Sequence, residues 1–75
     1  MTNGLRPANA GSQWEDTDPR AGLRVVVVIE GPTRRFGFVM VRYEVKVASR
    51  RPWTVGRKRW IRESTLRANY HRISH

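Results

Sequence analysis

The chain has 75 residues and no cysteine, and 15 lysine and arginine residues against 6 acidic residues give it a net charge of +9. A chain of this length buries about 60 % of its unfolded surface and forms one small core, which excludes two domains. The lack of cysteine excludes disulfide bonds and thiolate metal sites. No apolar run approaches the roughly 20 residues that span a bilayer, and the N-terminus lacks a secretory pattern, so we expect a cytoplasmic protein.

Two segments precede the first predicted strand. Residues 1–12 are small and polar and are interrupted by glycine and proline, which predicts a flexible, disordered arm. Residues 13–20 are expected to form an ordered turn, because aspartate favours turn backbones and proline fixes φ. Trp14 is expected to fill one end of the core. The folded domain is therefore predicted to span residues 13–75.

The carboxylates of Asp16 and Asp18 allow two interpretations. A calcium ion takes roughly six to eight oxygen ligands, more than this acidic cluster supplies. We expect instead that these carboxylates accept hydrogen bonds from turn amides and pair with Arg20 or Arg24. The sequence therefore predicts no metal site.

Two strands follow the turn. Residues 23–29 form a near-continuous apolar run with five β-branched residues in a row from Val25, which predicts a buried strand. Residues 30–33 predict a turn. Residues 36–47 alternate, with one apolar face and a second face that changes from apolar to charged, as in a strongly bent barrel strand with Gly37 as its bend.

Residues 50–62 carry six cations, two tryptophans and no acid. The motifs Arg-Arg-Pro-Trp and Arg-Lys-Arg-Trp lie seven residues apart, which predicts a β-hairpin with a type II′ turn beginning at Gly56. Trp53 would then face Trp60 across the hairpin. Pro52 cannot donate a hydrogen bond to a ladder, so the alternative is an irregular first arm without the Trp pair.

The C-terminal part of the sequence predicts two more short strands. Residues 60–66 favour a strand, residues 66–69 a turn or a single 3₁₀ turn, and residues 70–73 a last strand. No helix is predicted. Five short twisted strands can bury their apolar faces by closing on themselves, so we expect an all-β fold, a small five-stranded SH3-like barrel, with an OB-like barrel as the alternative.

Three motifs stand out along this chain: residues 11–20 (GSQWEDTDPR), residues 23–25 (LRV), and residues 59–62 (RWIR) leading through Leu66-Arg67 to residues 70–73 (YHRI). In these motifs the chain resembles, over residues 11–73, a group of small proteins from actinobacterial phages and their hosts. The group shares the W-x-D-x-D-P-R opening, and the D-x-D-P-R piece is the most specific part of the resemblance. Leu66 precedes Arg67 here, in the reverse of the group's order. The resemblance implies a phage-like origin and a compact β-barrel, without an activity.

The positive charge belongs to the predicted barrel. Residues 1–20 have a net charge of −1 and residues 21–75 a net charge of +10. Phosphate is the commonest partner of such a patch, arginine favours bidentate contacts with it, and tryptophan can stack on unpaired bases. We expect a module that binds nucleic acid with low sequence specificity, DNA in preference to RNA, as a monomer or weak homodimer. The candidate nucleic-acid-binding residues are Arg34, Arg35, Arg50, Arg51, Trp53, Arg57, Lys58, Arg59, Trp60 and Arg62.

Two other classes of function compete with nucleic-acid binding. The same basic surface could bind and inhibit an acidic protein of a bacterial host, or the strand at residues 36–47 could drive self-association through a sheet edge. Enzyme activity is not expected, because His71 and His75 lie in no catalytic pattern and no serine lies in a nucleophile motif. No cofactor and no membrane partner are expected.

Overall fold

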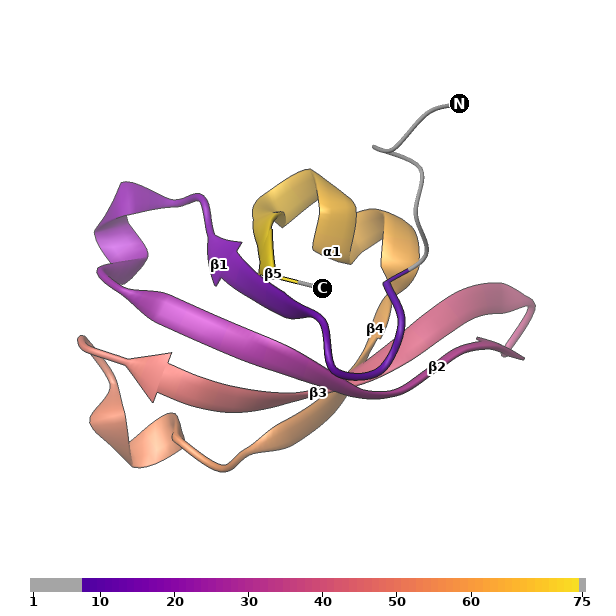
Figure 1. The fold of residues 1–75 in the computed structure, drawn as a ribbon, viewed down its shortest axis with the longest axis horizontal. Helices are drawn as coiled ribbons and strands as arrows, with labels where there is room; N and C mark the ends of the chain where they lie inside the picture. The colour runs from indigo at the N-terminus through magenta and orange to yellow at the C-terminus, as the bar shows by residue number, and fades with distance from the viewer. Residues whose placement is uncertain (1–7, 75) are drawn as a thin grey trace.

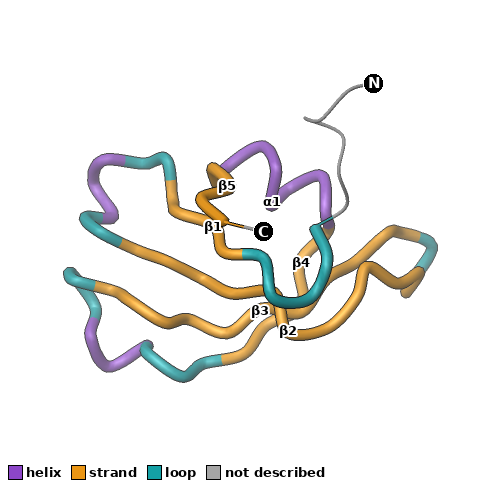
Figure 2. Tube along the Cα trace, viewed as in Figure 1, coloured by secondary structure: helices purple, strands orange, loops and turns teal. Residues whose placement is uncertain are grey.

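The computed structural model describes residues 8–74, which form one five-stranded antiparallel sheet with the strand order β4-β3-β2-β1-β5 (Figure 1). The strands are β1 (Gln13–Asp16), β2 (Arg24–Arg35), β3 (Phe38–Ala48), β4 (Lys58–Arg62) and β5 (Tyr70–Ser74). Within residues 8–74, helical segments lie only in the connections: η2 (Pro19–Ala21), η3 (Pro52–Thr54) and α1 (Glu63–Asn69) (Figure 2). The predicted small all-β, barrel-like fold is confirmed. No helix in residues 8–74 is long and apolar enough to cross a membrane.

The last strand of the chain pairs with the first. Strands β1 to β4 follow one another as neighbours, and β5 then pairs antiparallel with β1. The interior strand β3 lies between β2 and β4, so the prediction that it offers a sheet edge for self-association is wrong. The edges are β4 and β5.

One face of the sheet carries the core. The buried hydrophobic side chains are Ala8, Trp14, Val26, Val28, Val41, Tyr43, Val45, Ala48 and Leu66. In β2 the alternation is strict, since Val26 and Val28 are fully buried while Val25 and Val27 are half-buried. The valine run is therefore a strand with one buried face, which we call the inner face, and one outer face. Trp14 is buried in this core, as predicted.

The turn between β2 and β3 lies later than predicted. The expected turn at residues 30–33 is wrong, because β2 continues through it with an irregular register. The chain reverses instead at Phe36 and Gly37, whose φ angles are 55° and 80°. Positive φ at both central residues defines a two-residue type I′ turn, which matches the twist of the flanking strands. Phenylalanine is not a residue that this turn favours, so the sequence did not indicate it.

The predicted hairpin at residues 50–62 is wrong. Residues 52–54 form the 3₁₀ helix η3, and β4 pairs with β3 rather than with the preceding residues. The proline at position 52 cannot donate to a ladder but suits the start of a helix, and Thr54 Oγ1 donates to Arg51 O at 2.7 Å. The irregular first arm without a Trp pair is therefore the alternative that the structure supports.

The strand predicted at residues 60–66 is interrupted. β4 ends at Arg62, and the seven-residue helix α1 follows, against the prediction of no helix. Leu66 is its one buried residue, and Glu63 pairs with Arg67 one turn later at 3.6 Å. A helix this short depends on tertiary packing, and a single apolar residue gives no detectable period. The last predicted strand, now β5, is confirmed.

Part of the predicted N-terminal arm is ordered. Residues 8–12 pack against the sheet: Ala8 is buried, Gly11 N donates to Val28 O at 2.7 Å, and Trp14 Nε1 donates to Ser12 Oγ at 2.9 Å. The prediction of a disordered arm is therefore wrong for these residues, because they fill the core and satisfy backbone groups of β2. Residues 1–7, the rest of the predicted arm, lie outside the described residues.

Candidate functional site: an arginine-lined cavity

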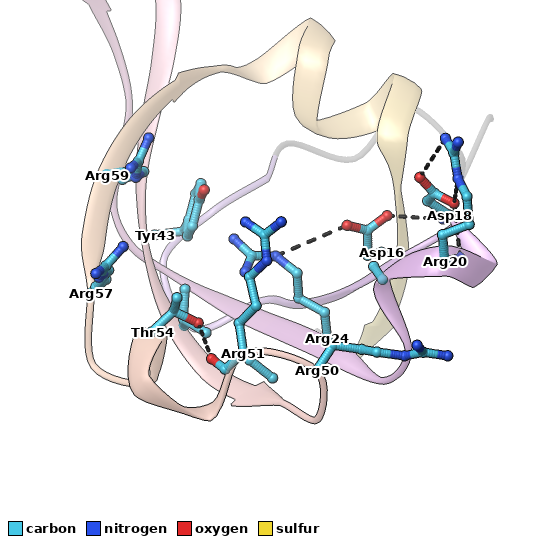
Figure 3. A pocket seen from close by; sticks show the side chains of 13 residues that line it. Asp16, Asp18, Arg20, Arg24, Tyr43, Arg50, Arg51, Thr54, Arg57 and Arg59 are labelled. Carbon is cyan, nitrogen blue, oxygen red and sulfur yellow. Dashed lines mark hydrogen bonds and ion pairs between the residues drawn. The ribbon is translucent and has the colours of Figure 1, made fainter.

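A cavity of about 460 Å³ opens at one end of the sheet, between the connection that contains η2 and the loop that contains η3 (Figure 3). Figure 3 shows Arg57 and Arg59 on the wall beside β4, and Asp18 and Arg20 on the opposite wall, with Arg24 and Arg51 extending into the space between. The lining residues are Asp16, Asp18, Arg20, Ala21, Arg24, Tyr43, Val45, Ala48, Arg50, Arg51, Thr54, Arg57 and Arg59.

Strand alternation brings one wall of arginines to the inner face. Arg59 pairs with Tyr43 across the β3–β4 ladder, and Tyr43 belongs to the core. The neighbouring Lys58 pairs with Glu44 and does not line the cavity. Successive side chains of a strand point to opposite faces, so Arg59 continues the core face of the sheet while Lys58 lies on the outer face.

The opposite wall is a hydrogen-bonded turn. Asp18 N donates to Asp16 Oδ1 and Arg20 N donates to Asp18 Oδ1, both at 2.9 Å, and the Arg20 guanidinium pairs with the Asp18 carboxylate at 3.1 Å. The side-chain and backbone hydrogen bonds from Arg20 lower the pKa of Asp18. The predicted use of these aspartates, to hold turn amides and to pair with arginine, is confirmed.

Among the described residues, two cavity arginines, Arg20 and Arg24, make an ion pair, and Arg24 is the more buried of the two. Its side chain is 21 % exposed, its Nε donates to Tyr70 Oη at 3.1 Å, and Asp16 Oδ2 lies 4.0 Å away. Burial alone would lower the pKa of Arg24, but the phenol groups of Tyr70 and Tyr43 raise it, so the guanidinium stays charged. Burial likewise raises the pKa of Tyr70, which therefore acts as a neutral hydrogen-bond acceptor.

Gly22 holds the two loops of the cavity together. Its φ is 67°, and a Cβ atom there would lie 2.5 Å from Ser49 Oγ and 2.8 Å from Arg50 Cγ. Leu23 N donates to Ser49 Oγ and Ser49 N donates to Leu23 O, both at 2.9 Å. The absence of a side chain at position 22 thus allows the η2 connection to fasten the loop that carries Arg50.

The positive charge of the cavity is not balanced. Three of the remaining acids pair elsewhere, Glu30 with Arg42, Glu44 with Lys46 and Glu63 with Arg67. Within the described residues, no ion pair joins an acid to the remaining cavity arginines, which are Arg50, Arg51, Arg57 and Arg59. Four guanidinium groups without acidic partners around one opening can accommodate an anion.

The ten candidate residues do not form one patch. Arg50, Arg51, Arg57 and Arg59 line the cavity, whereas Arg34 and Arg35 belong to the end of β2. The tip of the β2–β3 hairpin and the connections that border the cavity lie at opposite ends of the long axis (Figure 1).

The remaining four candidates lie outside the cavity. Trp60 and Arg62 contact hairpin residues, because the Arg35 guanidinium lies 4.3 Å from the Trp60 ring centroid and Arg62 lies 3.6 Å from that of Phe38. Lys58 is exposed on the outer face of β4, and Trp53 is 69 % exposed on η3. The structure therefore divides the predicted surface into a cavity and a hairpin end, with Lys58 and Trp53 in neither.

Nine of the thirteen described residues that line the cavity were not among the sequence candidates, and Arg20, Arg24 and Tyr43 are among the nine. Arg20 and Arg24 were expected only as partners of the aspartates, and Tyr43 was not among the candidates. For Arg20 and Arg24 the signal that could have found them is their closeness in sequence to the Asp-x-Asp-Pro-Arg turn, which must lie at the end of the sheet once residues 13–16 are recognised as a strand. Tyr43 is far from this turn in the sequence, and only the fold brings it to the cavity.

The described part of the chain contains no group of three histidine, aspartate or glutamate side chains that could hold a metal ion. Comparisons of the chain with protein-family models, with curated proteins and with solved structures found no match. The chemistry of the cavity is therefore the basis on which a function can be assigned.

Proposed function

We propose that this chain is a non-enzymatic module that binds nucleic acid through its backbone phosphates, with the arginine-lined cavity as the main contact. The observation that carries the proposal is the convergence of Arg50, Arg51, Arg57 and Arg59 on one cavity without acidic partners in the described residues. Guanidinium groups match the geometry of phosphate oxygens and bind them in bidentate fashion. This match supports a phosphate-bearing ligand rather than a neutral molecule, and we propose that the phosphates are those of a nucleic acid backbone.

The shape of the cavity supports a backbone contact rather than base-specific recognition. Its volume of about 460 Å³ can hold a phosphate with part of its sugar. The helix α1 has seven residues and uses Leu66 to pack on the core, so it is not a recognition helix for the major groove. Contacts to phosphates fix the position of the protein on the nucleic acid without reading the bases, so we expect low sequence specificity. The proposed ligand is DNA in preference to RNA.

The acidic groups of the cavity support binding rather than catalysis. Asp18 is held by Arg20, and Asp16 accepts from a turn amide and lies beside Arg24. A general base needs an available carboxylate with a raised pKa, whereas the pKa of Asp18 is lowered. These carboxylates therefore support a non-enzymatic binding protein. The proposal that it is phage-encoded and acts in the bacterial cytoplasm rests on the resemblance over residues 11–73 alone.

One observation favours a second candidate, an inhibitor that binds an acidic host protein. Trp53 is 69 % exposed and Val55 is 50 % exposed, and both flank Thr54, which lines the cavity. Exposed tryptophan beside arginine is typical of the centre of a protein interface. A pull-down from bacterial lysate with and without nuclease would distinguish the two candidates, because a protein partner survives the nuclease.

The direct test is a binding titration with labelled single-stranded and duplex DNA at two salt concentrations. We expect saturable binding that weakens steeply with salt, and loss of binding in the double variant Arg57→Glu, Arg59→Glu. A polyglutamate peptide serves as the acidic competitor without phosphate. Unchanged binding by the double variant would reject the cavity as the site, and equal competition by polyglutamate would favour an acidic protein as the ligand.

A further inference from the structure

The far end of the β2–β3 hairpin is an exposed aromatic structure that the cavity does not explain. Every residue from position 32 to position 39 is exposed, and Phe36 at the tip is 79 % exposed. Isolated exposed apolar residues are common, but here Phe38 and Val39 are exposed as well. The hairpin thus presents apolar surface to solvent at the end of the molecule opposite the cavity (Figure 1).

The backbone at the tip is unfavourable for the residue that occupies it. Phe36 has a φ of 55°, a left-handed conformation that bulky side chains rarely adopt. Its ring is not buried, so packing in this fold does not offset the cost. Asparagine or glycine would form the same type I′ turn with less strain. Strain at an exposed position indicates that the side chain serves a purpose other than folding.

Arginine side chains lie over the aromatic rings of this hairpin. The Arg35 guanidinium lies 5.4 Å from the Phe36 ring centroid and 4.3 Å from that of Trp60. Arg62 lies 3.6 Å from the Phe38 ring centroid. Flat cationic and aromatic groups therefore alternate on this surface, and no acid pairs with Arg34, Arg35 or Arg62 within the described residues.

We propose that the hairpin end, formed by residues 34–38 with Trp60 and Arg62, is a stacking site for unpaired nucleobases. Bases stack on aromatic rings and on guanidinium planes, while the positive charge attracts the adjoining phosphates. An acidic protein surface would satisfy the charge but would not use the flat aromatic faces. This inference rests on the proposed function and adds a base contact to the phosphate contact of the cavity.

The test compares two ligands that carry the same phosphates. A labelled oligothymidylate is titrated against an abasic oligonucleotide of equal length, with the wild type and with Phe36→Asn. The wild type is expected to prefer the oligothymidylate by about tenfold, equivalent to ~1.4 kcal/mol and to the stacking of about one base. Phe36→Asn should remove this preference, leave the abasic affinity unchanged and raise the unfolding midpoint, because it creates the Asn-Gly pair that a type I′ turn favours.

Two further variants make the test specific. Phe36→Tyr keeps an aromatic ring and should keep the preference, and Ile73→Thr removes an exposed apolar side chain from β5 and should also keep it. Equal wild-type affinity for both oligonucleotides would overturn the stacking site while the proposed function stands. Binding of neither oligonucleotide would overturn both. A Phe36→Asn variant that loses affinity only for anionic lipid vesicles would overturn base stacking in favour of a membrane contact.

Discussion

Two neighbouring residues of β4 can separate the charge of the cavity from the charge of the whole protein. Arg59 lines the cavity, whereas Lys58 lies on the outer face of the same strand. Both side chains are exposed, and neither makes an ion pair within the described residues. Arg59→Gln and Lys58→Gln therefore remove the same formal charge from adjacent positions, one inside the proposed site and one outside it.

The expected losses of affinity differ by about 5- to 50-fold. A hydrogen bond between charged groups contributes about 1.5–3 kcal/mol, so Arg59→Gln should weaken single-stranded DNA binding by roughly 10- to 100-fold. Lys58 lies outside the cavity and should contribute only long-range electrostatic attraction, which salt screens, so Lys58→Gln should weaken DNA binding about twofold. If the four unpaired cavity arginines each release counterions from one phosphate, the logarithmic salt slope is about −2.8, and Arg59→Gln should reduce its magnitude by about 0.7.

Fluorescence anisotropy of a labelled oligonucleotide over about 50 to 200 mM salt measures both quantities. Circular dichroism of each variant controls for folding. Equal losses of affinity in the two variants would mean that net charge alone drives binding. That result would refute the cavity as the site even if the protein binds DNA.

The remaining predictions concern the structure around the site. Gly22→Ala should destabilise the fold and weaken DNA binding, because the added Cβ would meet the facing loop. Gly56→Ala is the control: its φ is 94° and nothing lies within 4 Å of the added Cβ, so it should add only backbone strain of about 1–2 kcal/mol. Equal losses of stability for the two variants in urea unfolding would contradict the clash at position 22. Leu66→Ala should cost about 2–5 kcal/mol because this residue anchors α1 in the core, and a loss below about 1 kcal/mol would contradict that packing. Folding raises the pKa of Tyr70 above its ordinary value of 10.0, so the neutral phenol contributes its full share of stability below pH 10.0 and this contribution is lost as the pH rises through the folded-state pKa. Tyr70→Phe removes the titrating phenol, which is also the acceptor of Arg24, and should therefore flatten the loss of stability at alkaline pH. Thermal unfolding across this pH range measures the effect, and an unchanged slope in the variant would contradict it.

The sheet was predictable because its long strands carry strong patterns. The valine run of β2 and the alternation of β3 have enough β-branched residues to define strands and their buried face. The basic stretch was also recognised, since its charge is visible without any structure. These features are local in sequence, and a small all-β fold follows from them.

The errors came from short segments whose conformation depends on distant partners. Ala8 is ordered by Glu63, whose carboxylate accepts its amide at 2.9 Å, and this contact spans 55 residues. Leu66 makes α1 helical by entering a core that other strands build. Of the residues that line the cavity, the sequence named Arg57 and Arg59 as candidates but not Arg24, because only the fold brings Arg24 to the same cavity.

Because the cavity arginines Arg50, Arg51, Arg57 and Arg59 have no acidic partners within the described residues, their presence is not explained by the stability of the fold. Arg57 and Arg59 are exposed, make no ion pair within the described residues and lie on the same wall of one cavity (Figure 3). Neighbouring like charges repel one another, so this arrangement weakens the fold rather than stabilising it. Their removal leaves no buried charge without a partner, and variants at these positions should fold at least as well as the wild type. Because these arginines gain nothing for folding, we propose that they are retained for an anionic ligand, which guanidinium groups converging on an open cavity would suit.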